Sequence, residues 1–270
     1  MIKFKSFSSG SCGNCYFFGI ADERGYCSDA ILVDAGVSVR RLKTFLLSEG
    51  IQTDVIRALL VTHDHWDHIR SLGSFCKRLC VPVFAPGALQ SALLHHPGTG
   101  EYLKGVQRPL EDGWNDVLPG LVRARAFEVP HDASVTFGYE LELSDGGGVT
   151  RCAVITDCGR VLPDAQEVMT DVDALILESN YDPEMLRLGP YPPDLQARIR
   201  GGCGHLSNIE CAEALRSLGS PERLRSVFLC HLSEHNNTPE LALEASRKVL
   251  PSGVRLVALP RETASPMFQL

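Results

Sequence analysis

The stretch 61-VTHDHWDHIRSLGSF-75 places three histidines and two aspartates within six consecutive positions. An apolar run comes directly before these residues, and a helix-like run comes directly after them. Crowded imidazoles and carboxylates repel one another, require solvation and add nothing to a hydrophobic core. The composition of this stretch therefore favours a metal site over a purely structural role.

The spacing of the motif allows one turn to serve two metals. His63 and His65 alternate around Asp64 at the end of a predicted strand, so their side chains can converge on one point. The side chains of Asp67 and His68, at the start of the next helix, can converge on a second point nearby. A metal site needs three or more protein ligands and an open position for water. Further ligands must therefore come from elsewhere in the chain.

Three other metal-binding side chains follow apolar segments. His131 follows AFEVP, Asp157 follows VTRCAVIT and His231 follows SVFLC, each where a predicted strand meets a polar loop. Taken singly, each is an ordinary loop histidine or turn aspartate. Together with the motif at 63–68 they predict a site built at one rim of a sheet.

The hydrophobic pattern alternates between strand-like and helix-like runs. Strands are predicted at 4–8, 15–19, 30–36, 57–63, 81–85, 121–130, 135–143, 149–157, 173–179, 226–230 and 254–260. Helices are predicted at 39–50, 67–80, 86–95, 182–200, 208–219 and 239–250. The first half is rich in strands, and the second half repeats the order of strand then helix. We therefore expect an α/β fold with two sheets packed face to face and helices outside, in a single domain of residues 1–270.

Composition limits the class of protein. The 270 residues are 44% apolar and 22% charged, which is typical of a globular protein. No apolar run approaches the length of a membrane span, and residues 1–20 lack the apolar core of a signal peptide. The ten cysteines are scattered, so we expect them to be reduced and the protein to be cytoplasmic.

The net charge of −7 argues against a broad groove for nucleic acid, because such grooves usually carry a basic surplus. A small basic cluster can still suffice for an enzyme that holds one chain end. The local candidates are residues 40–43 and residues 198–200.

The ligand-type residues carry a resemblance to a known family. The pattern His-x-His-x-Asp-His at 63–68, followed by His131, Asp157 and His231, resembles the metallo-β-lactamase superfamily. That resemblance implies a four-layer αββα sandwich of two mixed sheets, with two metals bound at its rim. The runs SSGSCGN, ESNYD, GHLSN and HLSEHNN resemble the YycJ/WalJ-like branch, which is implicated in DNA exonuclease activity.

The resemblance implies a role for each ligand-type residue. One metal would be held by His63, His65 and His131, and the other by Asp67, His68 and His231. Asp157 would bridge the two, as a carboxylate can and a neutral imidazole cannot. Cys158, beside the bridge, is expected to be a packing residue. The donors suit two divalent ions, Zn²⁺ or Mn²⁺, and iron is also compatible.

The resemblance also implies residues that act beside the metals. His205 would approach the scissile phosphate and donate a proton or stabilise charge, although a surface histidine is the structural alternative. Asp67 is expected to take part in catalysis as well as in metal binding. Asp34, at the end of ILVDAG, would support the ligand loop by hydrogen bonds unless it is a simple turn residue.

Small polar residues near the predicted rim could contact a substrate. Their side-chain donors and the backbone N–H groups of their loops are suited to a phosphate. The candidates are Ser11, Asn14, Ser207, Asn208 and Asn237. Ser207 or Asn208 is also expected to cap the following helix.

The function that follows is a two-metal phosphodiesterase that trims DNA from an end or a single strand, with 5′-to-3′ polarity. A hydroxide held between the metals would be the nucleophile. Within the same fold, the alternatives are a hydrolase of cyclic phosphodiesters, thioesters or lactones, and an RNA nuclease. A non-enzymatic protein that binds metal or nucleic acid is a further alternative, but it would not need an open two-metal site.

Overall fold

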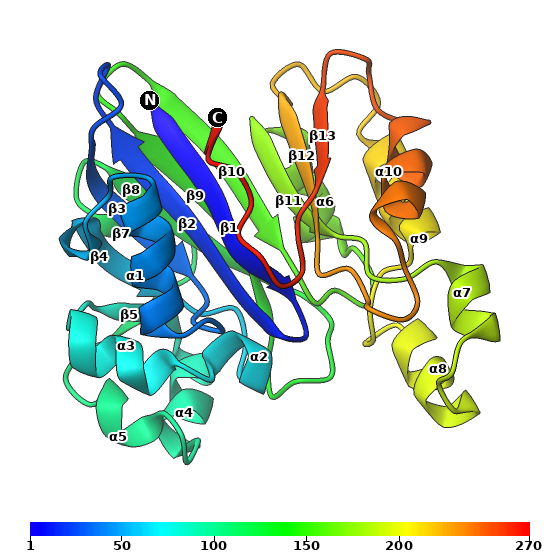
Figure 1. The fold of residues 1–270 in the computed structure, drawn as a ribbon, viewed down its shortest axis with the longest axis horizontal. Helices are drawn as coiled ribbons and strands as arrows, with labels where there is room; N and C mark the ends of the chain where they lie inside the picture. Colours follow the sequence, from blue (N-terminus) through cyan, green and yellow to red (C-terminus); the bar gives the residue numbers. More distant parts are fainter.

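The computed structural model describes residues 1–270 and contains two seven-stranded sheets (Figure 1). The first sheet has the order β14 (Phe268–Gln269), β1 (Ile2–Gly10), β2 (Gly13–Ala21), β3 (Cys27–Val33), β4 (Ile56–Leu60), β5 (Val83–Pro86) and β6 (Gln107–Leu110). The second has the order β13 (Arg255–Ala258), β12 (Ser226–Cys230), β11 (Ala174–Glu178), β10 (Val149–Ile155), β9 (Phe137–Ser144), β8 (Val122–Glu128) and β7 (Asn115–Leu118). Both are mixed: strands β3 to β6 and β10 to β13 pair in parallel, and the other neighbours pair antiparallel.

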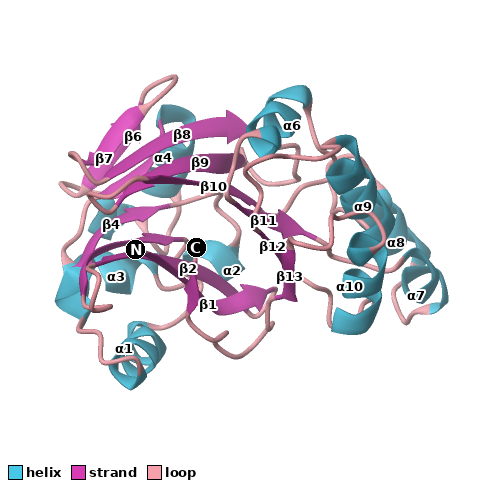
Figure 2. Cartoon of the chain, turned by 90° about the horizontal axis from the view of Figure 1, so that it is seen from above, coloured by secondary structure: helices cyan, strands magenta, loops and turns pink.

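Helices cover the outer face of each sheet. The first sheet carries α1 (Val39–Ser48), α2 (Trp66–Ile69), α3 (Leu72–Leu79), α4 (Gly87–His95) and α5 (Gly100–Leu103). The second carries α6 (Pro163–Thr170), α9 (Asn208–Ser217) and α10 (Pro239–Arg247), while α7 (Pro183–Leu188) and α8 (Pro193–Arg200) lie further out (Figure 2). None of the helices is both long enough and apolar enough to span a bilayer.

Alternation along β2 shows how the layers are held together. Tyr16 and Phe18 point into the cluster between the two sheets, while Cys15 and Phe17 point outward into the cluster beneath α1 and α3. Successive side chains of a strand face opposite sides, so a strand that is apolar at every position must be covered on both faces. A third cluster joins the second sheet to α6, α9 and α10. The predicted four-layer sandwich is confirmed.

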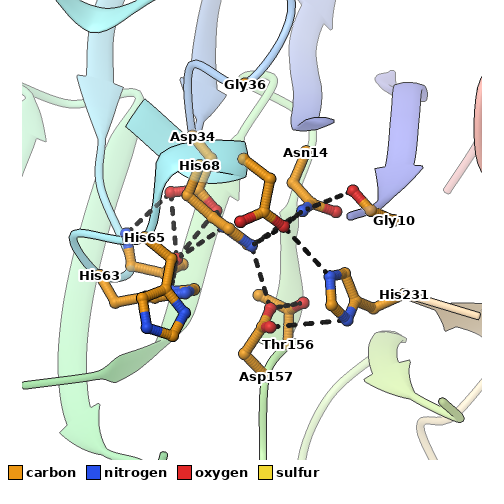
Figure 3. Close-up of polar contacts among 12 residues, drawn as sticks. Gly10, Asn14, Asp34, Gly36, His63, His65, His68, Thr156, Asp157 and His231 are labelled. Atoms are coloured by element: carbon orange, nitrogen blue, oxygen red, sulfur yellow. Dashed lines mark hydrogen bonds and ion pairs between the residues drawn. The ribbon is translucent and has the colours of Figure 1, made fainter. Parts of the chain in front are cut away.

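The parallel strands end at one edge of the sandwich, and the chain changes direction there. Asp34, Asp157 and His231 follow β3, β10 and β12 and have φ angles of 65°, 51° and 54°. These left-handed conformations are unfavourable for residues other than glycine. They turn the three side chains away from the strand direction, and Figure 3 shows Asp34, Asp157 and His231 grouped around the same region.

Some predicted elements differ in their bounds. The helix expected at 67–80 is broken between α2 and α3, and the one expected at 182–200 is two helices. The second break falls at 189–192, where Pro192 and Pro193 lack backbone N–H groups and Pro192 disfavours a helical Tyr191. The short edge strands β6, β7 and β14 were not predicted.

Candidate metal centre

The loop between β4 and α2 brings the histidine motif to the rim (Figure 3). His63 is fully buried, and its Nδ1 lies 3.0 Å from Oγ1 of Thr62. Its Nε2 is buried without any hydrogen-bond partner. A buried polar atom without a partner is costly in free energy, so this nitrogen fits a metal ligand.

One group consists of His63, His65 and His131, and the ring nitrogens that could bind a metal lie within 4.8 Å of one another. Nε2 of His131 is 3.2 Å from Nδ1 of His65. Nδ1 of His131 lies 2.9 Å from the carbonyl oxygen of Gly204. A carbonyl can only accept, so Nδ1 carries the proton of the neutral ring and Nε2 keeps its lone pair. The group therefore offers imidazole donors to one cation.

A second group consists of Asp67, His68 and His231, whose ligand atoms also lie within 4.8 Å of one another. Nδ1 of His68 lies 2.7 Å from Oδ2 of Asp34, and the backbone N–H of Thr62 donates to Oδ1 of Asp34 at 2.9 Å. The expected hydrogen bond from the Asp34 turn is therefore present. It orients the His68 ring and leaves Nε2 facing the centre.

Asp157 lies between the two groups. Its Oδ2 is 3.1 Å from Nε2 of His68, and its Oδ1 is 3.7 Å from Nε2 of His131. Oδ1 also lies 3.5 Å from Nδ1 of His231, so the carboxylate is close to members of both groups, which fits a bridging position. Cys158 belongs to the apolar cluster beneath α6 and α9, and its Sγ donates to the carbonyl oxygen of Arg160 at 3.1 Å.

Glu178, which was not predicted, is the buried acid behind the centre. Its Oε1 lies 2.7 Å from Nδ1 of His205 and 3.1 Å from Nδ1 of His231. Its Oε2 accepts the backbone N–H groups of Cys158 at 2.8 Å and Leu206 at 3.0 Å. The sequence signal was available, since an acidic residue ends the apolar strand ALILE. A carboxylate is rarely placed in such a position without a partner.

His205 stands in the wall of a cleft beside the two groups. Its ring centre is 5.0 Å from that of His131 and 5.3 Å from that of His231. Because Nδ1 is bound to Glu178, Nε2 is the nitrogen left free. The cleft has a volume of about 200 Å³. Its lining includes Ser11, Tyr191, Arg198, His205, His231 and Ser233.

The imidazoles of the centre divide into two classes by the direction of their pKa shifts. Burial lowers the pKa of His63, with a further contribution from neighbouring imidazoles, and burial also lowers the pKa of His131. Burial opposes a charge on His68, but nearby carboxylates outweigh it and raise its pKa to about 10. Burial also opposes a charge on His231, but the carboxylate of Asp157 outweighs burial and raises the pKa of His231. In turn, imidazolium neighbours hold the pKa of Asp157 well below its usual range despite burial.

Of the five residues expected to contact substrate, Ser11 alone lines the cleft. Asn14 is fully buried, and its Nδ2 donates to the carbonyl oxygen of Gly10 and to Oδ2 of Asp67, at 3.1 Å each. The same nitrogen lies 2.8 Å from Nε2 of His68. Asn14 therefore touches the second ligand group from behind, not the cleft.

The other three candidates have structural partners. The Ser207 side chain accepts from the backbone N–H of Glu210 and forms a capping box with it, as expected for the start of α9. Asn208 and Asn237 are buried and hydrogen-bond to each other, with Nδ2 to Oδ1 distances of 2.8 and 2.9 Å. Nδ2 of Asn237 also donates to the carbonyl oxygen of Ser179 at 2.8 Å. Direct substrate contact is not supported for these three side chains, because their polar atoms are already engaged below the cleft.

Comparison with known proteins agrees with the fold and the motif. Residues 29–231 match the family model described as the beta-lactamase superfamily domain. The chain is 30% identical over 249 residues to exodeoxyribonuclease YycJ of Bacillus anthracis, covering 92% of this chain and 89% of the relative. It is also 30% identical over 241 residues to exodeoxyribonuclease WalJ of Streptococcus pneumoniae, covering 89% and 85%.

A solved structure shows the same fold at lower sequence similarity. Zn²⁺-bound PqqB from Methylobacterium extorquens superposes with a TM-score of 0.70 at 17% identity, over 99% of this chain and all of that one. The predicted family is thereby confirmed by both sequence and fold. This chain belongs to the metallo-β-lactamase superfamily, in its YycJ-like branch, and is a metal-dependent hydrolase.

Proposed function

We propose that this hydrolase is a two-metal phosphodiesterase that removes nucleotides from an end of DNA, with 5′-to-3′ polarity. The observation that carries the proposal is the shared position of Asp157 between two donor groups, with the further imidazole of His205 on the cleft wall. The names of its relatives, both exodeoxyribonucleases, support DNA as the substrate.

Under this proposal, the two donor groups hold two divalent cations. His63, His65 and His131 would bind one, Asp67, His68 and His231 the other, and Asp157 would touch both. The unpartnered Nε2 of His63 and the mixture of imidazole and carboxylate donors support this assignment. The same donors suit Zn²⁺, Mn²⁺ or Fe²⁺. Such cations, when bound, make water a nucleophile at neutral pH and neutralise phosphate charge.

The protein's own side chains supply positioning and proton transfer. Asp34 orients His68 through Nδ1, which directs Nε2 toward Asp157 and Asn14. Asp67 is partly exposed, and its carboxylate is held by Nδ2 of Asn14. We assign Asp67 a second role, in accepting a proton from the attacking water.

His205 is the proposed general acid. Burial opposes its protonation, but the carboxylate of Glu178 outweighs that effect and raises the pKa of His205. Glu178 thus favours the protonated ring, which presents Nε2 to the cleft, where it can donate to the leaving oxygen of the cut strand. Glu178 is a positioning residue in this step, because it acts through His205.

The cleft wall supports a negatively charged substrate. Ser11 and Ser233 supply hydroxyl groups, and Arg198 supplies a guanidinium held by an ion pair with Asp132. This is the basic segment 198–200 noted in the sequence. Asp132 also lines the cleft and offsets the charge of Arg198, so most of the positive charge would come from the bound cations. A cleft of about 200 Å³ suits a chain end better than a duplex held along its length.

A small cyclic phosphodiester is the second candidate substrate, because the cleft of about 200 Å³ would also admit it. The deciding experiment compares rates on 5′-phosphorylated single-stranded DNA, RNA of the same sequence, a cyclic nucleotide, bis(p-nitrophenyl) phosphate and a thioester, with Mn²⁺ or Zn²⁺ added. We expect mononucleotides to be released from the 5′ end of DNA. Rapid hydrolysis of the cyclic nucleotide with intact DNA would reject the proposal, and release from the 3′ end would reject its polarity.

A further inference from the structure

We propose that Trp66 is a stacking platform for a nucleobase of the bound strand, a proposal that rests on the nucleic-acid function above. Trp66 lies between His65 and Asp67 in the ligand motif, but it is a member of neither donor group. The residue is 56% exposed. Burial of so large a ring would normally be favourable. Its exposure between two proposed metal ligands leaves an aromatic surface within reach of a bound strand.

The exposed ring is held in place from one side. The His96 ring, just after α4, stacks on it with ring centres 6.1 Å apart and planes inclined by 25°. Gly98 allows the same loop to approach closely, since a Cβ there would lie 3.2 Å from Cζ3 of the indole. An aromatic surface that is already fixed loses little entropy when a flat ligand stacks on it.

The charges around Trp66 suit a base attached to a phosphate. The carboxylate of Asp64 is engaged away from the ring, because it accepts from the backbone N–H of Ser134 at 3.2 Å and from the Ser134 hydroxyl. The guanidinium of Arg70, at the C-terminal end of α2, is engaged as well, because it donates to two backbone carbonyl oxygens. Positive charge beside the indole would come from the cations that the two flanking ligand residues of the motif are proposed to hold. An aromatic face beside positive charge is the usual arrangement for binding single-stranded nucleic acid.

A protein partner fits this surface less well. The seven large hydrophobic residues that are exposed are spread over the fold, and only Tyr102, on α5, belongs to an element adjoining this region. A protein-docking surface would need a contiguous apolar patch. A single braced ring in polar surroundings fits a single flat group instead. In Figure 1, α2 lies below the first sheet on the side toward α8.

The test uses the fact that the chain has only two tryptophans. In the Trp114→Phe variant, Trp66 is the only source of indole fluorescence; Trp114 lies over Arg123, near β7. This metal-loaded variant is mixed by stopped flow with a single-stranded decadeoxynucleotide, and in parallel with an abasic chain carrying the same phosphates. We expect rapid quenching before cleavage with the first strand, and none with the second.

Affinity for the two strands is then compared between the unsubstituted protein, Trp66→Ala and Trp66→Phe, each checked for metal content. Trp66→Ala should bind the base-containing strand about tenfold or more weakly, while Trp66→Phe should retain most of the affinity. Binding of the abasic chain should be the same in all three proteins.

The outcomes separate this proposal from the function on which it rests. If Trp66→Ala loses affinity equally for both strands, or for neither, the stacking role is rejected while DNA cleavage by the unsubstituted protein still stands. If the unsubstituted protein neither binds nor cuts DNA, the proposed function is rejected and the stacking role with it.

Discussion

Oε1 of Glu178 lies 2.7 Å from Nδ1 of His205, and the carboxylate is fully buried. The other oxygen of the carboxylate is fixed by two backbone N–H groups, so the acid cannot turn away from the imidazole. A buried carboxylate held in this way stabilises the protonated form of its partner. Under the proposed mechanism, the pair would therefore set the pH range in which His205 can donate a proton.

Glu178→Gln should move the alkaline limb of the kcat/KM pH profile to lower pH. A general acid must be protonated, and the raised pKa of His205 preserves activity as pH increases. Removal of the carboxylate charge lowers that pKa, so activity is lost sooner as pH rises. Glu244→Gln, on the exposed face of α10, is the matched control. An unchanged alkaline limb in Glu178→Gln would contradict this role.

His205→Ala should lower turnover by about a hundredfold or more, the usual range for a lost acid or oxyanion donor. Metal content should stay the same, because His205 is not among the proposed ligands. The measurements are elemental analysis and steady-state cleavage of 5′-phosphorylated DNA. His95→Ala, at an exposed side chain at the end of α4, is the control. A His205→Ala protein that keeps its metals and near-normal cleavage would reject the role, and one that loses a metal would make His205 a ligand.

The unsubstituted protein should bind two metal ions per chain after loading with Mn²⁺ or Zn²⁺. Asp157→Ala should lose metal and activity together, because the carboxylate faces both donor groups. Elemental analysis after removal of free metal measures the number of ions bound per chain. Asp116→Ala, at an exposed side chain of β7, is the control. Full dinuclear occupancy in Asp157→Ala would place the bridge on another residue.

Asp34→Asn should weaken one metal site more than the other. In this variant, Oδ1 can still accept from Thr62, but an amide N–H₂ would face Nδ1 of His68 in place of Oδ2. That change favours the tautomer with the proton on Nε2, the nitrogen needed for a metal. We expect affinity at the second site to fall about 10- to 100-fold, as measured by competition with a chelator. Asp29→Asn, in an exposed ion pair, should have no such effect, and equal affinity in both variants would argue against tautomer control.

Gly36→Ala should destabilise the fold around the metal centre. A Cβ at this position would lie 1.8 Å from the carbonyl oxygen of Asp67 and 2.3 Å from the backbone nitrogen of Asn14. Backbone atoms must move to relieve these contacts, so we expect the free energy of unfolding to fall by at least ~2 kcal/mol. Chemical denaturation measures the loss. Gly148→Ala, which meets nothing within 4 Å, should be near neutral, and similar stabilities for the two variants would show that the Gly36 turn can adjust.

The sequence was most informative about the proposed metal ligands, because both their residue types and their positions at strand ends indicate a metal site. The His63 to His68 motif combines residues that no core would use, and His131, Asp157 and His231 each end an apolar run. The strand order could not be read in the same way, because pairing depends on contacts between distant segments. Short edge strands such as β6 and β14 carry little hydrophobic pattern, so they were missed.

The supporting residues of the centre were harder to predict than the proposed ligands. Glu178 lies in an apolar strand, and its partner His205 is far along the chain, so no local spacing marks the pair. Asn208 and Asn237 are residues of a type common in phosphate-binding loops, but in the structure their side chains hydrogen-bond to each other. Residue type alone does not distinguish a polar side chain that faces a ligand from one that holds a loop together.

The left-handed backbone at Asp34, Asp157 and His231 has a consequence for the engineering of this protein. These are three of the four non-glycine residues with positive φ, and glycine would relieve the strain at each. Selection for relief of this backbone strain would therefore act at positions to which the proposed reaction assigns a role. A thermostabilised variant should be sought with these three codons held fixed, and with an activity screen in every round.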